Sequence, residues 1–476
     1  MKVCLVVEGC YPYVVGGVSS WVHNLIRQFP HTDFLVQTIV SDRKLRGRFA
    51  YELPKNVVEV REIYLQDEDW AGKTKRRGRR RLTAEQYAAL NSLVLGDDVD
   101  WRTVFTIFEK SFSVNDLLMG PEFLKIVEEC YRRRYSNLNF TDFLWTIRSM
   151  YLPLFYTLRN RPPEADLYHC VCTGYAGVWG AMAKERYQKP LLISEHGIYT
   201  REREEEIIKA RWVSGSYKNL WIDQFQKMSG CAYRYADRVT SLFQEARGLQ
   251  IELGCPREKT VVTPNGIRVE DFADIPRKAP GEESFHIGAV LRVAPIKDVK
   301  TMLHAFHYAK QRNPRLRLSI LGPWDEEPDY AQECFDLVER LQLKDVEFTG
   351  RVNVRDYIGT LDTLILTSIS EGQPLTILEG FAAHKPCIAT NVGNCRGLLY
   401  GEQDELGRAG IITPVMGVEK IGDAMLWMAD HPDEVRQMGE IGYRRVTQSY
   451  TVEQMRAAYR ELYRNVAEPY GAHLED

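Results

Sequence analysis

The chain has 476 residues, of which 44% are hydrophobic and 27% charged, and its formal net charge is −3 at pH 7. This length exceeds what one ordinary core holds, so we expect two or three domains. The nearly balanced charge gives no reason to expect nucleic acid as a partner, and no apolar run reaches the roughly 20 residues of a membrane-spanning helix. The ten cysteines show neither CxxC nor zinc spacing, which is typical of reduced core residues in a cytoplasmic protein.

Short apolar runs alternate with helical patterns from Met1 to about residue 264, which predicts a parallel sheet with crossover helices. The N-terminal run lacks the charged region and small-residue cleavage site of a signal peptide. The predicted strands are KVCLVVEG, FLVQTIV, DLYHCVCT, PLLISEHG, RVTSL and TVVTPNG. An aromatic-rich insertion at about residues 70–158, which includes TDFLWTIRSMYLPLFYTL, interrupts this pattern and is predicted to be largely helical.

A second alternation follows the segment IPRKAPGEES, whose proline, glycine and charge are typical of a linker. Its predicted strands are FHIGAVL, RLRLSILG, DVEFTG, DTLILTS, PCIAT and GIITP. The tail after residue 450 has a helical pattern. We therefore expect an N-terminal domain at 1–275, a C-terminal domain at 284–450 and a final helix at 451–476.

The stretch SISEGQPLTILEGFAAHKPCIAT indicates function most directly. Glu371 follows a predicted buried strand, and Pro374 stands where a helix would begin, since proline has no N–H to give. The first turn, at Leu375 and Thr376, would then offer free N–H groups and a partial positive charge to a phosphate. Glu379 lies further along the same predicted helix. Ligands of open α/β sheets bind outside the carboxyl ends of the strands, and carboxylates there can accept hydrogen bonds from sugar hydroxyls.

Two cations follow the first predicted strand of the second half. Arg292 and Lys297 lie in VLRVAPIKD, where they could stabilise the charge that develops on a diphosphate leaving group. Arginine can hold two oxygens at once, and lysine acts as a point charge. Taken alone, the same residues could be ordinary surface cations of an exposed loop.

Three features of the first half also follow predicted strands. Gly16 and Gly17 open a predicted helix, where glycine lets the backbone approach a ligand. His196 lies in LLISEHGIYTRERE, and its neighbour Glu195 could orient the imidazole or contact an acceptor. Asn265 closes the last strand in TPNGI and is interpreted as structural or hinge-like.

Two glutamates separated by seven residues, with Gly-x-Pro between them, resemble the signature of the GT4 family of retaining glycosyltransferases. The resemblance implies an α/β GT-B fold, in which two Rossmann-like domains face each other across a cleft and the last helix crosses back to the first domain. It implies a UDP-sugar donor and no cofactor or metal. The roles that it implies place the donor sugar at Glu371, the ribose at Glu379, the uracil near Arg351, and the diphosphate at Arg292, Lys297 and the amides near Pro374, Leu375 and Thr376. Gly16, Gly17 and His196 would close over the donor.

The opening EGCYPYVVGGVSSWVHNLI, the insertion and SEHGIYTRERE together resemble one subgroup, the cytoplasmic glycosyltransferases of the Pel exopolysaccharide system. This resemblance implies UDP-glucose or a UDP-N-acetylhexosamine as donor, a growing polysaccharide as acceptor, and docking to inner-membrane Pel proteins. The protein would then be cytoplasmic, at most peripheral at the inner face of the membrane.

The sequence also permits other interpretations. Asp67-Glu68-Asp69 fits the Asp-x-Asp pattern of metal-dependent glycosyltransferases, although an exposed loop explains it better. The basic run KTKRRGRRR at 73–81 is a solvated loop or a surface for an anionic membrane or partner. A sugar-nucleotide epimerase of GT-B fold and a catalytically weak assembly subunit are the rival functions. The long insertion argues against the first, and the intact site residues argue against the second.

Overall fold

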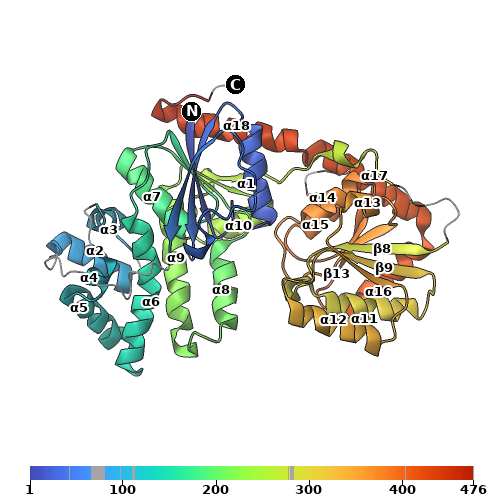
Figure 1. Cartoon of the computed structure of the whole chain (residues 1–476), viewed down its shortest axis with the longest axis horizontal. Helices are drawn as coiled ribbons and strands as arrows, with labels where there is room; N and C mark the ends of the chain where they lie inside the picture. Colours follow the sequence, from blue (N-terminus) through green and yellow to red (C-terminus); the bar gives the residue numbers. More distant parts are fainter. Residues whose placement is uncertain are drawn as a thin grey trace. The chain divides into compact units, whose positions relative to one another are not determined.

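The computed structural model describes residues 1–41, 43–65, 81–96, 98–109, 113–276, 278, 283–402 and 404–474. The Asp67-Glu68-Asp69 triplet and residues 73–80 of the basic run lie outside these residues. The chain divides into two compact units, one formed by Met1–Val262 with Tyr459–Asp476 and the other by Thr263–Ala458. Each unit is built on one parallel sheet with helical crossovers (Figure 1), as the alternating sequence pattern predicts.

The sheet of the first unit has seven strands in the order β3-β2-β1-β4-β5-β6-β7, and all of its pairs are parallel. The central strands are apolar on both faces because helices cover both sides of a parallel sheet. The strands are β1 Lys2–Glu8, β2 Asp33–Val40, β3 Val57–Tyr64, β4 Leu167–Cys170, β5 Leu191–Ser194, β6 Arg238–Ser241 and β7 Thr260–Val262.

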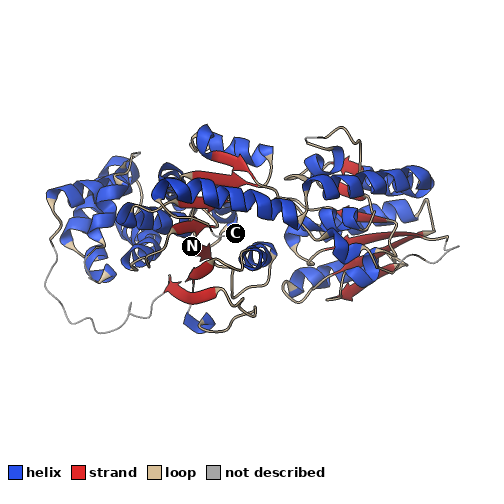
Figure 2. Ribbon diagram, turned by 90° about the horizontal axis from the view of Figure 1, so that it is seen from above, coloured by secondary structure: helices blue, strands red, loops and turns tan. Residues whose placement is uncertain are grey.

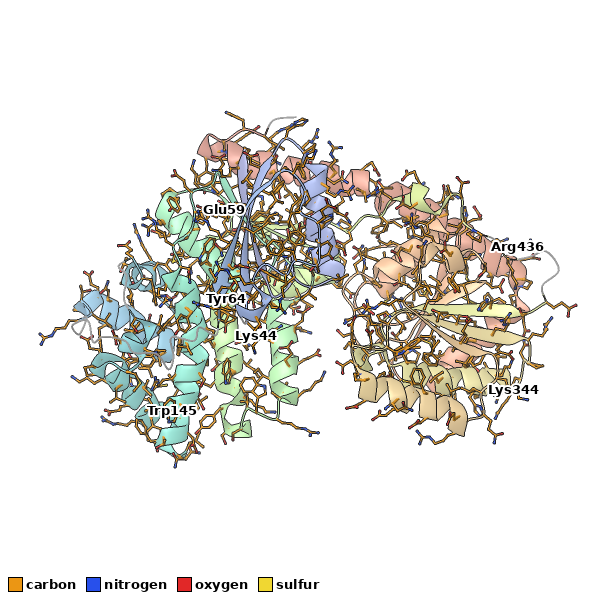
Figure 3. All side chains as sticks on the ribbon, in the orientation of Figure 1. Lys44, Glu59, Tyr64, Trp145, Lys344 and Arg436 are labelled. Atoms are coloured by element: carbon orange, nitrogen blue, oxygen red, sulfur yellow. The ribbon has the colours of Figure 1, made fainter. Side chains whose placement is uncertain are left out.

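Strand β3 is absent from the sequence prediction. It is an edge strand, and its sequence VVEVREIY carries exposed Glu59 and Arg61 among its apolar residues. Figure 3 labels Glu59 and Tyr64 on this strand. Because an edge strand buries only part of its surface, its polar residues hide the apolar run that marks the other strands.

Helices connect the strands of the first unit, and a group of them forms the insertion between β3 and β4. The insertion and the sheet share one hydrophobic core, in which Tyr151 and Phe155 of the insertion are buried with Trp179. The insertion helices are α2 Ala84–Leu95, α3 Trp101–Ile107, α4 Val114–Leu118, α5 Pro121–Cys130 and α6 Phe140–Arg159, with a π-helical turn at Tyr131–Tyr135. The other helices are α1 Gly17–Gln28, α7 Tyr175–Tyr187, α8 Tyr199–Lys209, α9 Lys218–Tyr235 and α10 Gln244–Glu252.

The last helix, α18 Val452–Ala467, begins in the second unit, and its residues from Tyr459 onward belong to the first. Two of its tyrosine hydroxyls are buried against the sheet of the first unit. The Tyr463 hydroxyl lies 2.9 Å from His169 Nδ1, and the Tyr459 hydroxyl lies 3.0 Å from Ser194 Oγ. The C-terminal helix is thus part of the hydrogen-bonded core of the first unit.

The second unit has six parallel strands in the order β10-β9-β8-β11-β12-β13, all of which the sequence predicts. Two hydrophobic clusters lie on its two faces, one with α11, α12 and α16 and the other with α14, α15 and α17, and Figure 2 shows helices on both sides of this sheet. The strands are β8 Phe285–Val290, β9 Leu316–Leu321, β10 Val346–Gly350, β11 Thr363–Leu366, β12 Cys387–Thr390 and β13 Gly410–Thr413. The helices are α11 Val299–Lys310, α12 Pro328–Arg340, α13 Arg355–Ile358, α14 Leu375–Ala382, α15 Cys395–Tyr400, α16 Val418–Asp430 and α17 Pro432–Ser449.

All ten cysteines are free thiols, and most of them are buried. Among the helices that the structure describes, none combines the length and the apolar character that a membrane crossing requires.

Candidate active site

Two loops of the second unit are tied together at the carboxyl edge of its sheet. The loop after β11 donates from the Ile369 amide to the Ile296 carbonyl at 2.9 Å. The Thr367 hydroxyl donates to the carbonyls of Lys297 and Asp298 at 3.0 and 3.1 Å. These bonds hold the loop after β8 against the loop after β11, so that side chains from the two loops meet.

The side chains that meet there are Lys297 and Glu371. Lys297 Nζ lies 2.5 Å from Glu371 Oε1, and the two side chains are only 20% and 11% exposed. The Ser368 hydroxyl donates to the same carboxylate oxygen at 2.5 Å. The pair is held between two backbone segments, so both groups are positioned before any ligand arrives.

Helix α14 starts beside this pair, at Leu375, with Pro374 as its N-cap residue and no side chain capping it. The amides of Leu375 and Thr376 therefore have no intrahelical acceptor. The Thr376 hydroxyl donates to the Val290 carbonyl at 3.2 Å, which fixes the helix start to the end of β8. This arrangement leaves two backbone donors and the positive end of the helix dipole for an anion.

Glu379 lies four residues after Leu375, on the same face of α14. The helix starts at Leu375 and ends at Ala382, so Glu379 lies about one turn from its start. Burial raises the pKa of the Glu379 carboxyl from 4.5 to about 7, and the charge of Arg355 opposes that rise. Within the described residues the Glu379 carboxylate has no hydrogen-bond partner. It is thus an isolated acceptor in a poorly solvated position.

Arg292 and Arg351 meet a carboxylate that the sequence analysis did not single out. Arg292 Nη1 donates to Glu326 Oε2 at 2.7 Å, and Arg351 Nη2 lies 3.4 Å from Glu326 Oε1. The three residues follow β8, β9 and β10, which are neighbours in the sheet. Arg292 therefore pairs with Glu326 while Lys297 pairs with Glu371, and the two cations do not share one partner.

Several buried polar atoms beside the same loops have no hydrogen-bond partner in the described part of the chain. They are Asn265 Oδ1, Gln373 Nε2 and Asn394 Nδ2. The backbone amide of Asn265 donates a hydrogen bond to Gln373 Oε1 at 2.7 Å. Buried polar atoms without partners are uncommon and indicate a bound water or ligand.

Gly393 is a second residue that the sequence analysis missed. Its φ is +49°, and a Cβ there would lie 2.2 Å from the Glu371 carbonyl oxygen and 2.4 Å from that of Gly372. Only glycine tolerates both the left-handed backbone and this close approach. Its position within NVGN, directly after β12, is the signal that could have identified it.

In the first unit, Gly16 is the N-cap residue of α1 and Gly17 is its first residue. The Gly16 backbone is extended, and a Cβ at either glycine would meet no atom within 4 Å. Both residues are exposed. There is therefore open space beside the backbone at both glycines, and the fold of this unit alone does not require glycine at either position.

His196 follows β5 and packs edge-on against Trp21, with 4.3 Å between the ring centroids. Burial lowers the pKa of its imidazole to about 4, so the ring is neutral at physiological pH. Its Nε2 is buried and has no partner among the described residues. A neutral ring of this kind can give or accept one hydrogen bond, but it does not supply a positive charge.

The interpretation of Glu195 as a group that orients His196 or contacts an acceptor is wrong. Glu195 is 3% exposed, and its carboxylate accepts hydrogen bonds from the Tyr233 hydroxyl at 2.7 Å, from Gln250 Nε2 at 3.0 Å and from the Thr173 hydroxyl at 3.0 Å. These partners occupy both oxygens inside the core. Glu195 therefore stabilises the loop that carries His196 without facing the same space.

Glu8, at the end of β1, is a candidate that the sequence analysis did not identify. Its carboxylate accepts from the Tyr199 hydroxyl at 3.2 Å, and from the Ala176 amide and Cys172 Sγ at 3.3 Å each. Burial raises its pKa. Together with His196 it lines a cavity of about 230 Å³. A carboxylate at the carboxyl end of a central strand is the signal that could have found it.

The comparisons with known proteins agree with this architecture. The chain belongs to the family described as Domain of unknown function (DUF3492), which matches residues 1–258, and residues 284–431 match the family described as Glycosyl transferases group 1. The second match contains Arg292, Lys297, Glu371 and Glu379. The protein is a glycosyltransferase with the GT-B fold, as the spacing of the two glutamates suggested.

Individual relatives are distant. The chain is similar to the MMP alpha-(1->4)-mannosyltransferase of Mycolicibacterium hassiacum, at 24% identity over 62% of this chain and 69% of that protein. It is similar to the D-inositol 3-phosphate glycosyltransferase of Kribbella flavida, at 27% identity over 43% of this chain and 51% of that protein. Among solved structures, Anabaena Alr3699/HepE in complex with UDP matches with a TM-score of 0.61 and 15% identity, over 97% of this chain and 99% of that one.

Proposed function

We propose that this protein is a retaining glycosyltransferase that moves a hexose-type sugar from a UDP-sugar to a growing exopolysaccharide. The observation that carries the proposal is the Lys297–Glu371 pair, held at 2.5 Å beside the uncapped start of α14. A lysine, a carboxylate and two free backbone amides at one sheet edge suit a diphosphate joined to a polyhydroxyl group. The UDP bound in the HepE structure supports UDP as the nucleotide.

In this proposal the donor spreads along the carboxyl edge of the second sheet. The diphosphate takes Lys297, Arg292 and the amides of Leu375 and Thr376, and Glu371 accepts from hydroxyls of the donor sugar. The ribose lies at Glu379, whose carboxylate has no hydrogen-bond partner among the residues that the structure describes. The uracil lies near Arg351. Arg292 leaves Glu326 to reach the diphosphate, a change that its 57% exposed side chain permits.

The chemical step follows from these positions. An acceptor hydroxyl forms a bond to the anomeric carbon on the face from which the diphosphate leaves. The bond between that carbon and the β-phosphate oxygen breaks, its electron pair leaves with UDP, and the acceptor proton passes to an oxygen of the departing phosphate. Lys297 and Arg292 stabilise the growing negative charge more in the transition state than before it. We propose no metal for this step.

Gly16, Gly17 and His196 are assigned to the acceptor side. The open space at the glycines leaves room for ligand atoms next to the backbone. The neutral His196 has an unpaired ring nitrogen that can bond a sugar hydroxyl. Glu8 joins this group because it lines the same cavity as His196.

We also propose that the polymer is the Pel exopolysaccharide and that the protein is of the PelF type. The opening segment, the helical insertion and SEHGIYTRERE support this assignment through their resemblance to that subgroup. The protein would then work in the cytoplasm, docked to inner-membrane Pel proteins. If the protein does not co-purify with those membrane proteins from cells that make the polymer, the proposed docking is refuted.

The first test is a panel of UDP-, GDP- and ADP-sugars in a thermal-shift assay. A ligand present at 100 times its Kd stabilises the folded state by about 2.7 kcal/mol. We expect UDP-glucose or UDP-N-acetylhexosamines to raise the melting temperature, and the other nucleotides to have little effect. A larger shift with GDP- or ADP-sugars would refute the nucleotide assignment, and an inverted anomeric configuration in the product would refute retention.

A further inference from the structure

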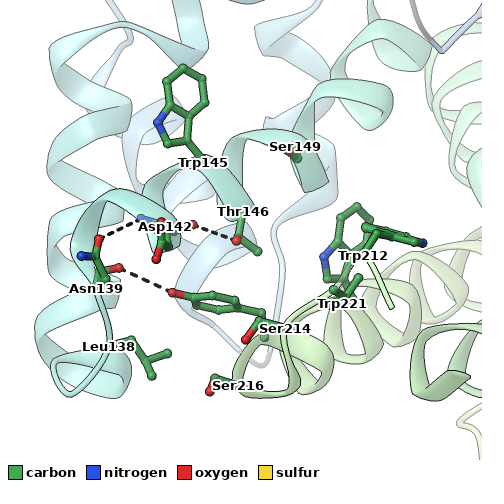
Figure 4. Close-up of a pocket in the computed structure, with 12 residues that line it drawn as sticks. Leu138, Asn139, Asp142, Trp145, Thr146, Ser149, Trp212, Ser214, Ser216 and Trp221 are labelled. Carbon is green, nitrogen blue, oxygen red and sulfur yellow. Dashed lines mark hydrogen bonds between the residues drawn. The ribbon is translucent and has the colours of Figure 1, made fainter. Parts of the chain in front are cut away.

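A pocket on the insertion remains outside the site described above. It has a volume of about 480 Å³ and lies between the start of α6 and the segment that joins α8 to α9 (Figure 4). This volume is within the range of small-molecule binding sites, which is roughly 300–1,000 Å³. Its aromatic members are Trp145, Trp212, Tyr217 and Trp221.

The exposure of two of these tryptophans is unusual for the molecule. Trp145 is 49% exposed and Trp212 is 70% exposed, and no other tryptophan in the described ranges is exposed. Both line the same pocket, Trp145 from α6 and Trp212 from the segment that joins α8 to α9 (Figure 4), and Figure 3 shows Trp145 on the insertion. Trp212 packs edge-on against Trp221, with 5.5 Å between centroids. Large apolar groups gathered at one exposed place mark a binding surface.

Polar groups between the rings have unused hydrogen-bonding capacity. The side-chain oxygen of Asn139 caps α6 by accepting from the Asp142 backbone amide. The side-chain nitrogen of Asn139 and the Asp142 carboxylate have no hydrogen-bond partner in the described structure. Ser214 stands at the N-cap of a short 3-10 helix, Gly215–Tyr217, yet its hydroxyl does not cap it. The hydroxyls of Ser149 and Ser216 are likewise unpaired there. Hydrogen-bonding groups and aromatic rings therefore line one space.

The charges of the residues that line the pocket restrict the class of ligand that it can bind. Asp142 is the only charged residue among the lining residues, which include no lysine or arginine. The Arg148 guanidinium lies 4.7 Å from the centroid of the Trp145 ring, but Arg148 is buried and does not line the pocket. A phosphate, a nucleic acid or an anionic lipid would therefore meet no cation among the lining residues. A pyranose ring has an apolar C–H face that suits the negative face of an indole, and a rim of hydroxyls that suits amide, carboxylate and hydroxyl groups.

We propose that this pocket binds a neutral segment of the saccharide chain that the enzyme extends. Helix α8 connects the two regions, since it begins three residues after His196 and ends at Lys209, three residues before Trp212. Its 11 residues span about 16 Å at 1.5 Å per residue. The pocket would therefore hold sugar units several residues behind the growing end. This inference rests on the proposed function, because it takes the acceptor to be a polysaccharide.

The test uses the full-length protein with cellohexaose and chitohexaose as probes, and measures binding by calorimetry and tryptophan fluorescence. We expect the wild-type protein to bind at least one of them, and Trp145→Ala and Trp212→Ala each to weaken binding at least tenfold. Trp212→Phe should retain most of the affinity because it keeps an aromatic face. The control Ile208→Ala removes a comparably exposed apolar group, 56% exposed, outside the pocket, and should change nothing.

UDP binding separates this proposal from the proposed function. The tryptophan variants should bind UDP as the wild type does, and Glu371→Gln should lose transfer while keeping oligosaccharide binding. Oligosaccharide binding that survives in the double variant Trp145→Ala/Trp212→Ala would overturn the proposal, as would a wild-type protein that binds neither probe. Variants that keep saccharide binding but lose a protein partner would assign the pocket to that partner instead, which also overturns it.

Discussion

The Glu379→Gln substitution is expected to stabilise the unliganded protein at alkaline pH while it weakens UDP binding. Burial raises the pKa of the Glu379 carboxyl from 4.5 to about 7. The folded state thus holds this proton more tightly than the unfolded chain does. Stability therefore falls as the pH rises from 4.5 to about 7, and the loss persists at higher pH. A difference of about 2.5 pKa units corresponds to about 3 kcal/mol, which the ionised carboxylate costs the wild type.

Glutamine has nearly the same shape and never ionises, so the variant avoids this cost. Near pH 4.5 the two proteins should melt together. At pH 8 the variant should melt about 6–12 °C higher, since 1 kcal/mol shifts the melting temperature by about 2–4 °C in a unit of this size. The assay is thermal melting without ligand across pH 4.5–8, with Glu333→Gln, on the exposed face of α12, as the matched control. Parallel melting curves for wild type and variant would refute the assigned burial of Glu379.

Three further outcomes test the site. Lys297→Ala should lower turnover by roughly 100-fold or more, since transition-state charge stabilisation of a few kcal/mol is lost. The control Lys300→Ala removes an exposed lysine paired with Glu333 and should leave turnover nearly unchanged. Equal turnover in the two variants would exclude Lys297 from the diphosphate site. Glu371→Gln should mainly reduce kcat and leave the affinity for UDP about as before, because the proposed contact is to the transferred sugar. If Glu371→Gln instead abolished UDP binding, the assignments of the two glutamates would be reversed. Transfer should persist in EDTA, and a strict requirement for manganese or magnesium in the chemical step would contradict the metal-free proposal.

The sequence predicts the second unit well because its strands are buried on both faces. Each of the six is a short apolar run, and the loops that follow them carry Arg292, Lys297 and Glu371 to one edge by topology alone. Strand β3 escapes prediction because an edge strand mixes exposed charge with apolar residues. Glu326 escapes for a related reason, since an acidic loop such as Asp325-Glu326-Glu327 is typical of a solvated surface.

Side-chain direction is the property that sequence adjacency conveys least. Glu195 and His196 are consecutive, which suggested that one orients the other. Successive side chains of an extended segment point to opposite sides, and here the carboxylate faces the core while the imidazole lies against Trp21. The same alternation hid Glu8, which ends an otherwise apolar strand. Both errors come from long-range packing, which decides what each side of a strand meets.

The unpaired carboxylate of Glu379 also predicts how the ligand binds. If ribose hydroxyls donate to it, they favour its ionised form, and its pKa of about 7 must fall on binding. Binding of UDP-glucose at pH 7 should then release up to about half a proton, the fraction that a group of this pKa still holds. Calorimetry in phosphate and in Tris, whose ionisation enthalpies differ, measures this release. Glu379→Gln should show none of it, and a release of equal size in that variant would place the titrating group elsewhere.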